Sequence, residues 1–220
     1  MWTREIFKML MEGIIDTLYM TLVSTFMGYV IGLPMGIVLA VTDKQGIKPN
    51  KFIYKLLDFV ANVIRSIPFL ILLIVLIPFT KLVVGRSYGS TATIVPLVIA
   101  AAPFIARLVE SSIQEVDKGV IEAAESMGAG TFTIIRKVLL VEARTSLLVG
   151  VTIATGTILG YSAMAGIVGG GGLGDIAIRY GYNRYQSDIM LITIVLLIIL
   201  VQLFQGLGMM LSNKLDKRKR

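Results

Sequence analysis

Residues 107–144 read RLVESSIQEVDKGVIEAAESMGAGTFTIIRKVLLVEAR, a charged and helix-prone stretch between long apolar segments. The stretch holds six of the 14 acidic residues of the chain: Glu110, Glu115, Asp117, Glu122, Glu125 and Glu142. The segments on either side are apolar enough to cross a bilayer. A charged insert in such a chain belongs outside the hydrocarbon, so we expect it to project from the membrane and to bind a soluble partner.

Composition identifies the compartment. Hydrophobic residues make up 55% of the 220 residues, charged residues make up 16%, and the mean hydropathy is +0.82. Because a soluble domain carries about 25% charged residues, these values indicate an integral membrane protein of one domain. The chain contains no Cys and no His, which removes thiol nucleophiles, imidazole bases and the commonest zinc ligands. We expect no catalytic residue, no metal site and no cofactor.

Five apolar segments are long enough for membrane helices, which need about 20 residues. We predict spans near 17–41, 59–80, 89–107, 146–168 and 189–211, within a transmembrane domain that covers 17–211. The other segments are an external amino-terminal segment (1–16), a loop (108–145), an irregular stretch (169–188) and a basic tail (212–220). The second span contains Arg65, which lies about two helical turns from Asp58 and is expected to snorkel or form an ion pair there.

Basic residues concentrate on the cytoplasmic side of membrane proteins, so their distribution predicts the orientation. One set of loops holds 14 of them: Lys44, Lys48, Lys51, Lys55, Arg107, Lys118, Arg136, Lys137, Arg144, Lys214, Lys217, Arg218, Lys219 and Arg220. The opposite set holds six: Arg4, Lys8, Lys81, Arg86, Arg179 and Arg184. We therefore predict an external amino terminus and a cytoplasmic carboxyl terminus. The +7 net charge then reflects orientation and contact with anionic lipid, and no nucleic-acid partner is expected.

The first span contains Gly28, Gly32, Pro34 and Gly36, and the later spans are similarly rich in small residues and proline. Small residues let membrane helices approach closely. The pattern favours tight packing of the bundle, and a bundle that moves stays an alternative.

The charged loop is predicted to form two helical parts. Residues 113–120 and 121–127 can be helical, with Gly119 between them and Gly128 as a terminator. A second helix over 131–143 would place Phe132, Ile135 and Leu139 on one face. The loop is thus a short helix, a glycine break and a helix that returns to the membrane.

These residues follow a known pattern. Glu122-Ala123-Ala124, three residues, Gly128 and nine further residues to Val138-Leu139-Leu140-Val141 resembles the cytoplasmic loop of permease subunits of ATP-binding-cassette importers. In that family the pattern ends in Ile, any residue, Leu, Pro, so Val138 is a mild change and Val141 replaces a proline. The departure at Val141 puts in doubt the bend that this proline gives after the coupling helix.

Two other stretches strengthen the resemblance, which covers about residues 10 to 212. Arg65-Ser66-Ile67-Pro68-Phe69 resembles the Arg-x-x-Pro segment of such permeases. Residues 161–166 (YSAMAG) and 169–182 (GGGGLGDIAIRYGY) resemble methionine-importer permeases, whereas relatives for osmoprotectants share only the shorter Gly-Gly-Leu-Gly core. The resemblance implies a type I importer permease fold, a homodimer, two cytoplasmic ATPase subunits and an external substrate-binding protein.

The resemblance also implies functional residues. In the family the short loop helix docks in a cleft of the ATPase, and the corresponding coupling residues here are Glu122, Ala123, Ala124, Met127 and Gly128. Candidates for the pathway or gate are Ser162, Met164 and Pro68. The glycine run at 169–174 lacks the Lys-Ser/Thr of a phosphate-binding loop and is expected to be a flexible external turn.

Three functions compete. The first is an importer permease for methionine, in its L and D forms, and the second is the same machine for another small solute such as an osmoprotectant. The third is a secondary transporter or channel, which would usually show intramembrane carboxylates and inverted repeats. The five predicted spans contain no acid, so the sequence favours a permease that draws its energy from a separate ATPase.

Overall fold

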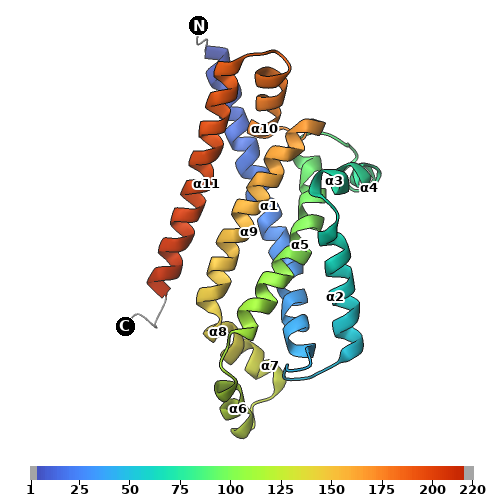
Figure 1. The fold of residues 1–220 in the computed structure, drawn as a ribbon, viewed down its shortest axis with the longest axis vertical. Coiled ribbons are helices and arrows are strands. Elements are labelled where there is room, and N and C mark those ends of the chain that lie inside the picture. Colours follow the sequence, from blue (N-terminus) through green and yellow to red (C-terminus); the bar gives the residue numbers. More distant parts are fainter. Residues whose placement is uncertain (1–3, 216–220) are drawn as a thin grey trace.

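The computed structural model describes residues 4–215, and in that part of the chain every regular element is helical (Figure 1). The α-helices are α1 (Arg4–Thr42), α2 (Lys51–Ser66), α3 (Phe69–Val75), α4 (Ile77–Val84), α5 (Ser90–Gln114), α6 (Lys118–Ser126), α7 (Thr131–Ile134), α8 (Leu140–Glu142), α9 (Arg144–Ala165), α10 (Gly172–Ile176) and α11 (Ser187–Leu215). Two π-helical segments, Ile135–Leu139 and Ala177–Tyr182, and a 3₁₀ turn, Gly166–Val168, complete the set. The ends of the predicted terminal segments, 1–3 and 216–220, lie outside the described residues.

Within residues 4–215, four helices are long and apolar enough to cross a membrane, and a bent helix pair makes a fifth candidate span. The predicted fold class, an all-α membrane protein, is therefore confirmed. The first helix is longer than expected, because α1 starts at Arg4 and takes in nearly all of the proposed external segment 1–16. The third span also runs further, since α5 continues to Gln114 inside the predicted loop.

The predicted second span, 59–80, is not one straight helix. Helices α2 and α3 are bent by 99° to each other at a break around Ile67 and Pro68. Ile67 has an extended backbone, with φ −84° and ψ 124°, because the ring of a following proline excludes the helical conformation. The second span therefore changes direction at Pro68, and α3 and α4 lie beside the upper part of α5 (Figure 1).

Small residues bring α1 and α5 into direct backbone contact. A Cβ atom added to Gly32 would lie 2.6 Å from the carbonyl oxygen of Ala102, and one added to Gly36 would lie 2.5 Å from that of Ala106. Such distances leave no room for a side chain. The glycines of the first span are thus explained by close helix packing, which makes α1 and α5 the central pair of the bundle.

The glycine run after α9 is ordered rather than irregular. Gly171 and Gly172 adopt positive φ angles of 83° and 76°, and the chain then folds back as α10 against the end of α9. A Cβ on Gly174 would lie 2.1 Å from the carbonyl oxygen of Ala163. The Thr17 hydroxyl also accepts a hydrogen bond of 2.9 Å from the Leu173 amide. The prediction of a flexible turn is therefore wrong, because backbone contacts with α9 and α1 hold the run.

The two ends of the bundle differ. Helix α6 projects from one end, while the amino end of α1 and the short helix α10 lie at the other (Figure 1). The carboxyl end of α11 points toward the α6 end (Figure 1). Many large apolar side chains on α2, α9 and α11 are exposed in the single subunit, which leaves them available to lipid or to another protein.

Candidate functional site

Helix α6, at the projecting end, starts at a side-chain cap. The Asp117 carboxylate accepts a hydrogen bond of 2.7 Å from the Gly119 amide, which satisfies one free donor of the first turn. The helix break therefore falls at residues 115–117, between Gln114 and Lys118. Gly119, which was predicted to separate two helices, lies inside the first turn of α6 instead.

The other end of α6 is closed by Gly128, as predicted. Its φ is +77°, a left-handed conformation that side chains other than glycine rarely adopt. The Gly128 amide donates to the Glu125 carbonyl at 2.8 Å, and the Ala129 amide donates to the Ala124 carbonyl at 3.1 Å. This pair of bonds is a Schellman motif, which satisfies the last carbonyls of the helix and sets the direction in which the chain leaves it.

The two alanines of the predicted coupling motif have different surroundings. Ala124 is only 5% exposed and packs into the hydrophobic core of the subunit, with the partly buried Ile121 beside it. Ala123 is exposed, and it shares a face with Val120 and Met127, which are spaced three and four residues from it. Met127 is 81% exposed. One face of α6 thus anchors the helix and the other presents a small apolar surface to solvent.

Glu122 is exposed on the flank of α6 and borders a groove of about 560 Å³. The far wall of this groove is the turn between α1 and α2, which includes Gln45 and Gly46. The Lys118 ammonium group donates to the Gln45 side-chain oxygen at 2.8 Å and ties the turn to the start of α6. Sequence reasoning missed this turn, because nothing in residues 43–48 indicates that they lie beside the loop.

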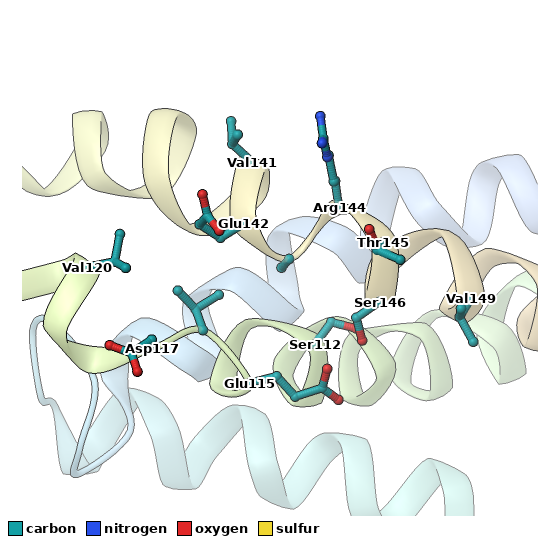
Figure 2. A pocket seen from close by; sticks show the side chains of 12 residues that line it. Ser112, Glu115, Asp117, Val120, Val141, Glu142, Arg144, Thr145, Ser146 and Val149 are labelled. Carbon is teal, nitrogen blue, oxygen red and sulfur yellow. The ribbon is translucent and has the colours of Figure 1, made fainter. Parts of the chain in front are cut away.

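A second groove, of about 400 Å³, lies on the other side of the α6 base. Figure 2 shows Glu115 and Asp117 on one wall, with Glu142 and Arg144 on the segment that forms the other. With a groove on each side of its base, α6 is exposed over most of its surface and contacts the bundle through the side that carries Ala124. A helix in this position can enter a cleft of a partner.

The return segment after Gly130 departs from the predicted single helix. Phe132 is 74% exposed whereas Leu139 is 2% exposed, so the two do not share a face. The cause is the π-helical segment Ile135–Leu139, whose wider turn changes the helical phase. Val141, at the position of the family proline, is part of the short helix α8, which ends at Glu142 one residue before α9 starts.

The predicted gate residues fall in two environments. Met164 is 49% exposed on the open face of α9, Ile153 is exposed about three turns earlier on the same face, and Ile167 is exposed on the 3₁₀ turn that follows. Ser162 is 1% exposed, and its hydroxyl donates to the Leu159 carbonyl at 2.7 Å. Ser162 therefore does not reach the surface on which Met164 lies.

Pro68, the third gate candidate, is exposed at the break between α2 and α3. The next residue, Phe69, is buried and stacks on the Tyr161 ring of α9, with 4.5 Å between the ring centroids. The bend at Pro68 thus brings the second span onto α9 one turn before Met164.

A polar cluster between α2 and α5 was not predicted. The Arg107 guanidinium forms ion pairs with Asp58 and with Glu110, the latter at 2.7 Å, and it donates to the Asn62 side-chain oxygen at 3.1 Å. Asp58 was considered as a partner for Arg65, but it pairs with Arg107, and Arg65 is exposed. The spacing of Arg107 and Glu110 by one helical turn could have indicated the cluster, but the predicted boundary separated them, with Arg107 at the end of the third span and Glu110 in the loop.

The chain is a helical membrane bundle from which a short capped helix projects, and this helix is available to a partner at that end of the bundle. The sequence model of the family "Binding-protein-dependent transport system inner membrane component" matches residues 32–217, and this chain belongs to that family. It is a permease subunit of an ATP-binding-cassette importer, with the type I importer permease fold.

The chain is similar along most of its length to several named proteins. The probable D-methionine transport system permease protein MetI of Vibrio cholerae is 51% identical over 203 residues, which cover 92% of this chain and 90% of the relative. The methionine import system permease protein MetP of Bacillus subtilis is 46% identical over 180 residues, which cover 82% and 81%. A permease chain in an inward-facing structure of the MetNI methionine ABC transporter matches with a TM-score of 0.96 at 46% identity, covering 98% of this chain and all of that one.

Proposed function

We propose that this chain forms the transmembrane pathway for methionine, in its L and D forms, in an ATP-driven importer. The observation that carries the assignment to an ATP-driven importer is the capped helix α6. Its Ala124 is anchored in the core, and its Val120, Ala123 and Met127 face solvent. Relatives that share the family and nearly the whole length of this chain are named for methionine or D-methionine transport. The solute assignment extends their names to this chain.

The proposed partners are a second copy of the chain, two copies of a cytoplasmic ATP-binding-cassette ATPase and an external substrate-binding protein. The exposed apolar face of α6 fits an ATPase cleft, because small side chains such as Ala123 allow close approach and Met127 adapts to an irregular surface. Glu122 adds a charged contact on the flank, and Gly128 holds the helix end. The exposed apolar residues of α9 and α2 supply surface for the homodimer.

The proposed orientation places the amino terminus outside and the carboxyl terminus in the cytoplasm of a prokaryotic cell membrane. Two observations support it. Basic residues are concentrated in the loops at the α6 end, and the amino end of α1 lies at the opposite end of the bundle from α6 (Figure 1).

The proposed pathway runs along the open face of α9 in the dimer, with Met164 near its narrowest point. A flexible thioether gives a gate that yields to a passing zwitterion without binding it strongly. Pro68 positions the second span against this face through the stacking of Phe69 on Tyr161. The hydroxyl of Ser162 is turned into the helix, so we assign Ser162 to support of Met164 rather than to solute contact.

The test is reconstitution of the permease with its ATPase and binding protein in proteoliposomes. Methionine should accumulate when ATP is present on the cytoplasmic face, and omission of the binding protein should abolish accumulation. Uptake of a quaternary amine without uptake of methionine would overturn the solute assignment. Uptake that persists without ATP and follows an ion gradient would overturn the importer assignment.

A further inference from the structure

Arg107 lies at the junction of two helices that the transport cycle has to coordinate. It is on α5, two turns before this helix ends at Gln114 and the chain continues into α6. Its guanidinium reaches across to α2, where it contacts Asp58 and Asn62. The same guanidinium holds Glu110, which is buried on α5 itself. One side chain thus neutralises an acid on each helix.

The rest of α2 is weakly held. Among its residues, all of which the structure describes, Ala61 is the one that is fully buried. Exposed apolar side chains such as Phe52 and Phe59 turn away from the subunit. The polar cluster therefore supplies much of the connection between α2 and α5.

The far end of α2 leads to the proposed gate. After the bend at Pro68, Phe69 stacks on Tyr161, and Met164 follows one turn later on α9. A displacement of α6 can thus pass along α5 to Arg107, across to Asp58, and along α2 to the α9 face. Because Ala61 is the one fully buried residue of α2, we expect this route to depend largely on the ion pairs.

We propose that Arg107, with Asp58 and Glu110, is a positioning site that makes α2 and α5 move as one body when the ATPase displaces α6. The inference rests on the proposed coupling role of α6. It assigns the link between the docking helix and the second span to specific charges. An ion pair suits this task because the Arg107 and Asp58 side chains are only 19% and 34% exposed, so parting α2 from α5 would separate two partly desolvated charges.

The first measurement is hydrogen exchange of the assembled transporter in lipid nanodiscs. In Arg107→Ala, amides of α2 (51–66) should exchange at least about tenfold faster than in the wild type, while those of α5 near Leu97 keep their protection. Lys8→Ala, which removes the exposed ion pair with Glu12 at the other end of the bundle, is the control and should leave α2 unchanged. This measurement needs neither solute nor ATP turnover, so it can fail independently of the proposed function.

The second measurement is methionine accumulated per ATP hydrolysed in proteoliposomes. Arg107→Ala should lower this ratio at least about tenfold, the change that 1.4 kcal/mol gives, while ATP hydrolysis stays within about twofold. Asp58→Asn, which keeps the side-chain shape, should show the same loss if Arg107→Ala does not assemble. The double variant Asp58→Arg with Arg107→Asp should restore the ratio, because the guanidinium then reaches residue 107 and Glu110 from α2.

Three results would overturn the inference. The first is unchanged exchange of α2 in both single variants. The second is faster exchange with a wild-type ratio, which would make the cluster a structural contact alone. The third is an equal fall in uptake and hydrolysis that the charge exchange does not restore, since this would indicate general damage.

Discussion

Replacement of Gly128 by alanine tests how the docking helix is held. A Cβ atom at this position would meet nothing within 4 Å among the described residues, so a steric clash plays no part. The cost comes from the backbone alone, because φ is +77°. Holding an L-residue in the left-handed conformation costs about 1–2 kcal/mol, which lowers the equilibrium constant for the closed Schellman turn about 5- to 30-fold.

Gly130, two residues later, is a matched control. Its φ is −71° and a Cβ there also meets nothing within 4 Å in the described part of the chain. Gly130→Ala should therefore be neutral, whereas Gly128→Ala should reduce ATP-dependent uptake with membrane insertion unchanged. Gly128→Asn should fall between them, because asparagine tolerates the left-handed region better than alanine.

The assay is solute uptake and ATP hydrolysis by the reconstituted transporter, normalised to the ATPase that co-purifies with the permease. If Gly128→Ala and Gly130→Ala behave alike, the left-handed turn does not control docking and the reasoning is refuted. Full uptake by Gly128→Leu, whose larger side chain meets the same backbone cost, would refute it as directly.

Three further outcomes are expected. Gly36→Ala should lower the melting temperature of the purified subunit, because its Cβ would lie 2.5 Å from the Ala106 carbonyl oxygen. Gly206→Ala, which is in open space on α11, should leave the melting temperature unchanged. Equal melting temperatures for the two variants would contradict the close packing of α1 against α5. Met164→Trp should block uptake without loss of assembly, and normal transport by this variant would exclude Met164 from the gate. Because the chain has no cysteine, Glu5→Cys and Asn213→Cys report the two ends. An impermeant thiol reagent should label position 5 and not position 213 in intact cells, and the reverse pattern would invert the proposed topology.

The sequence by itself determined the class of protein and most of its outline. Long apolar segments against a low share of charge leave few alternatives to a helical membrane bundle, because the cost of burying polar backbone in lipid selects helices. The spacing of Glu122, Ala124 and Gly128 identified the projecting helix and its terminator. These features are local, since each depends on residues within a few turns of one another, and local patterns can be read without a structure.

Features that depend on contacts between distant residues required the tertiary structure. Asp58 and Arg107 are 49 positions apart, and Thr17 and Leu173 are 156 positions apart. No periodicity within one segment indicates such pairs. The sequence therefore did not indicate that Asp58 pairs with Arg107, and it described the tightly packed glycine run as flexible.

The direction in which a side chain points was also decided by packing. Ala123 and Ala124 are neighbours of the same type, yet one is exposed and the other is buried, because α6 rests on the core through a single face. The π-helical segment Ile135–Leu139 similarly changed the face on which Leu139 lies relative to Phe132. A regular helical repeat assumes a constant angle per residue, and only the packed structure shows where that angle changes.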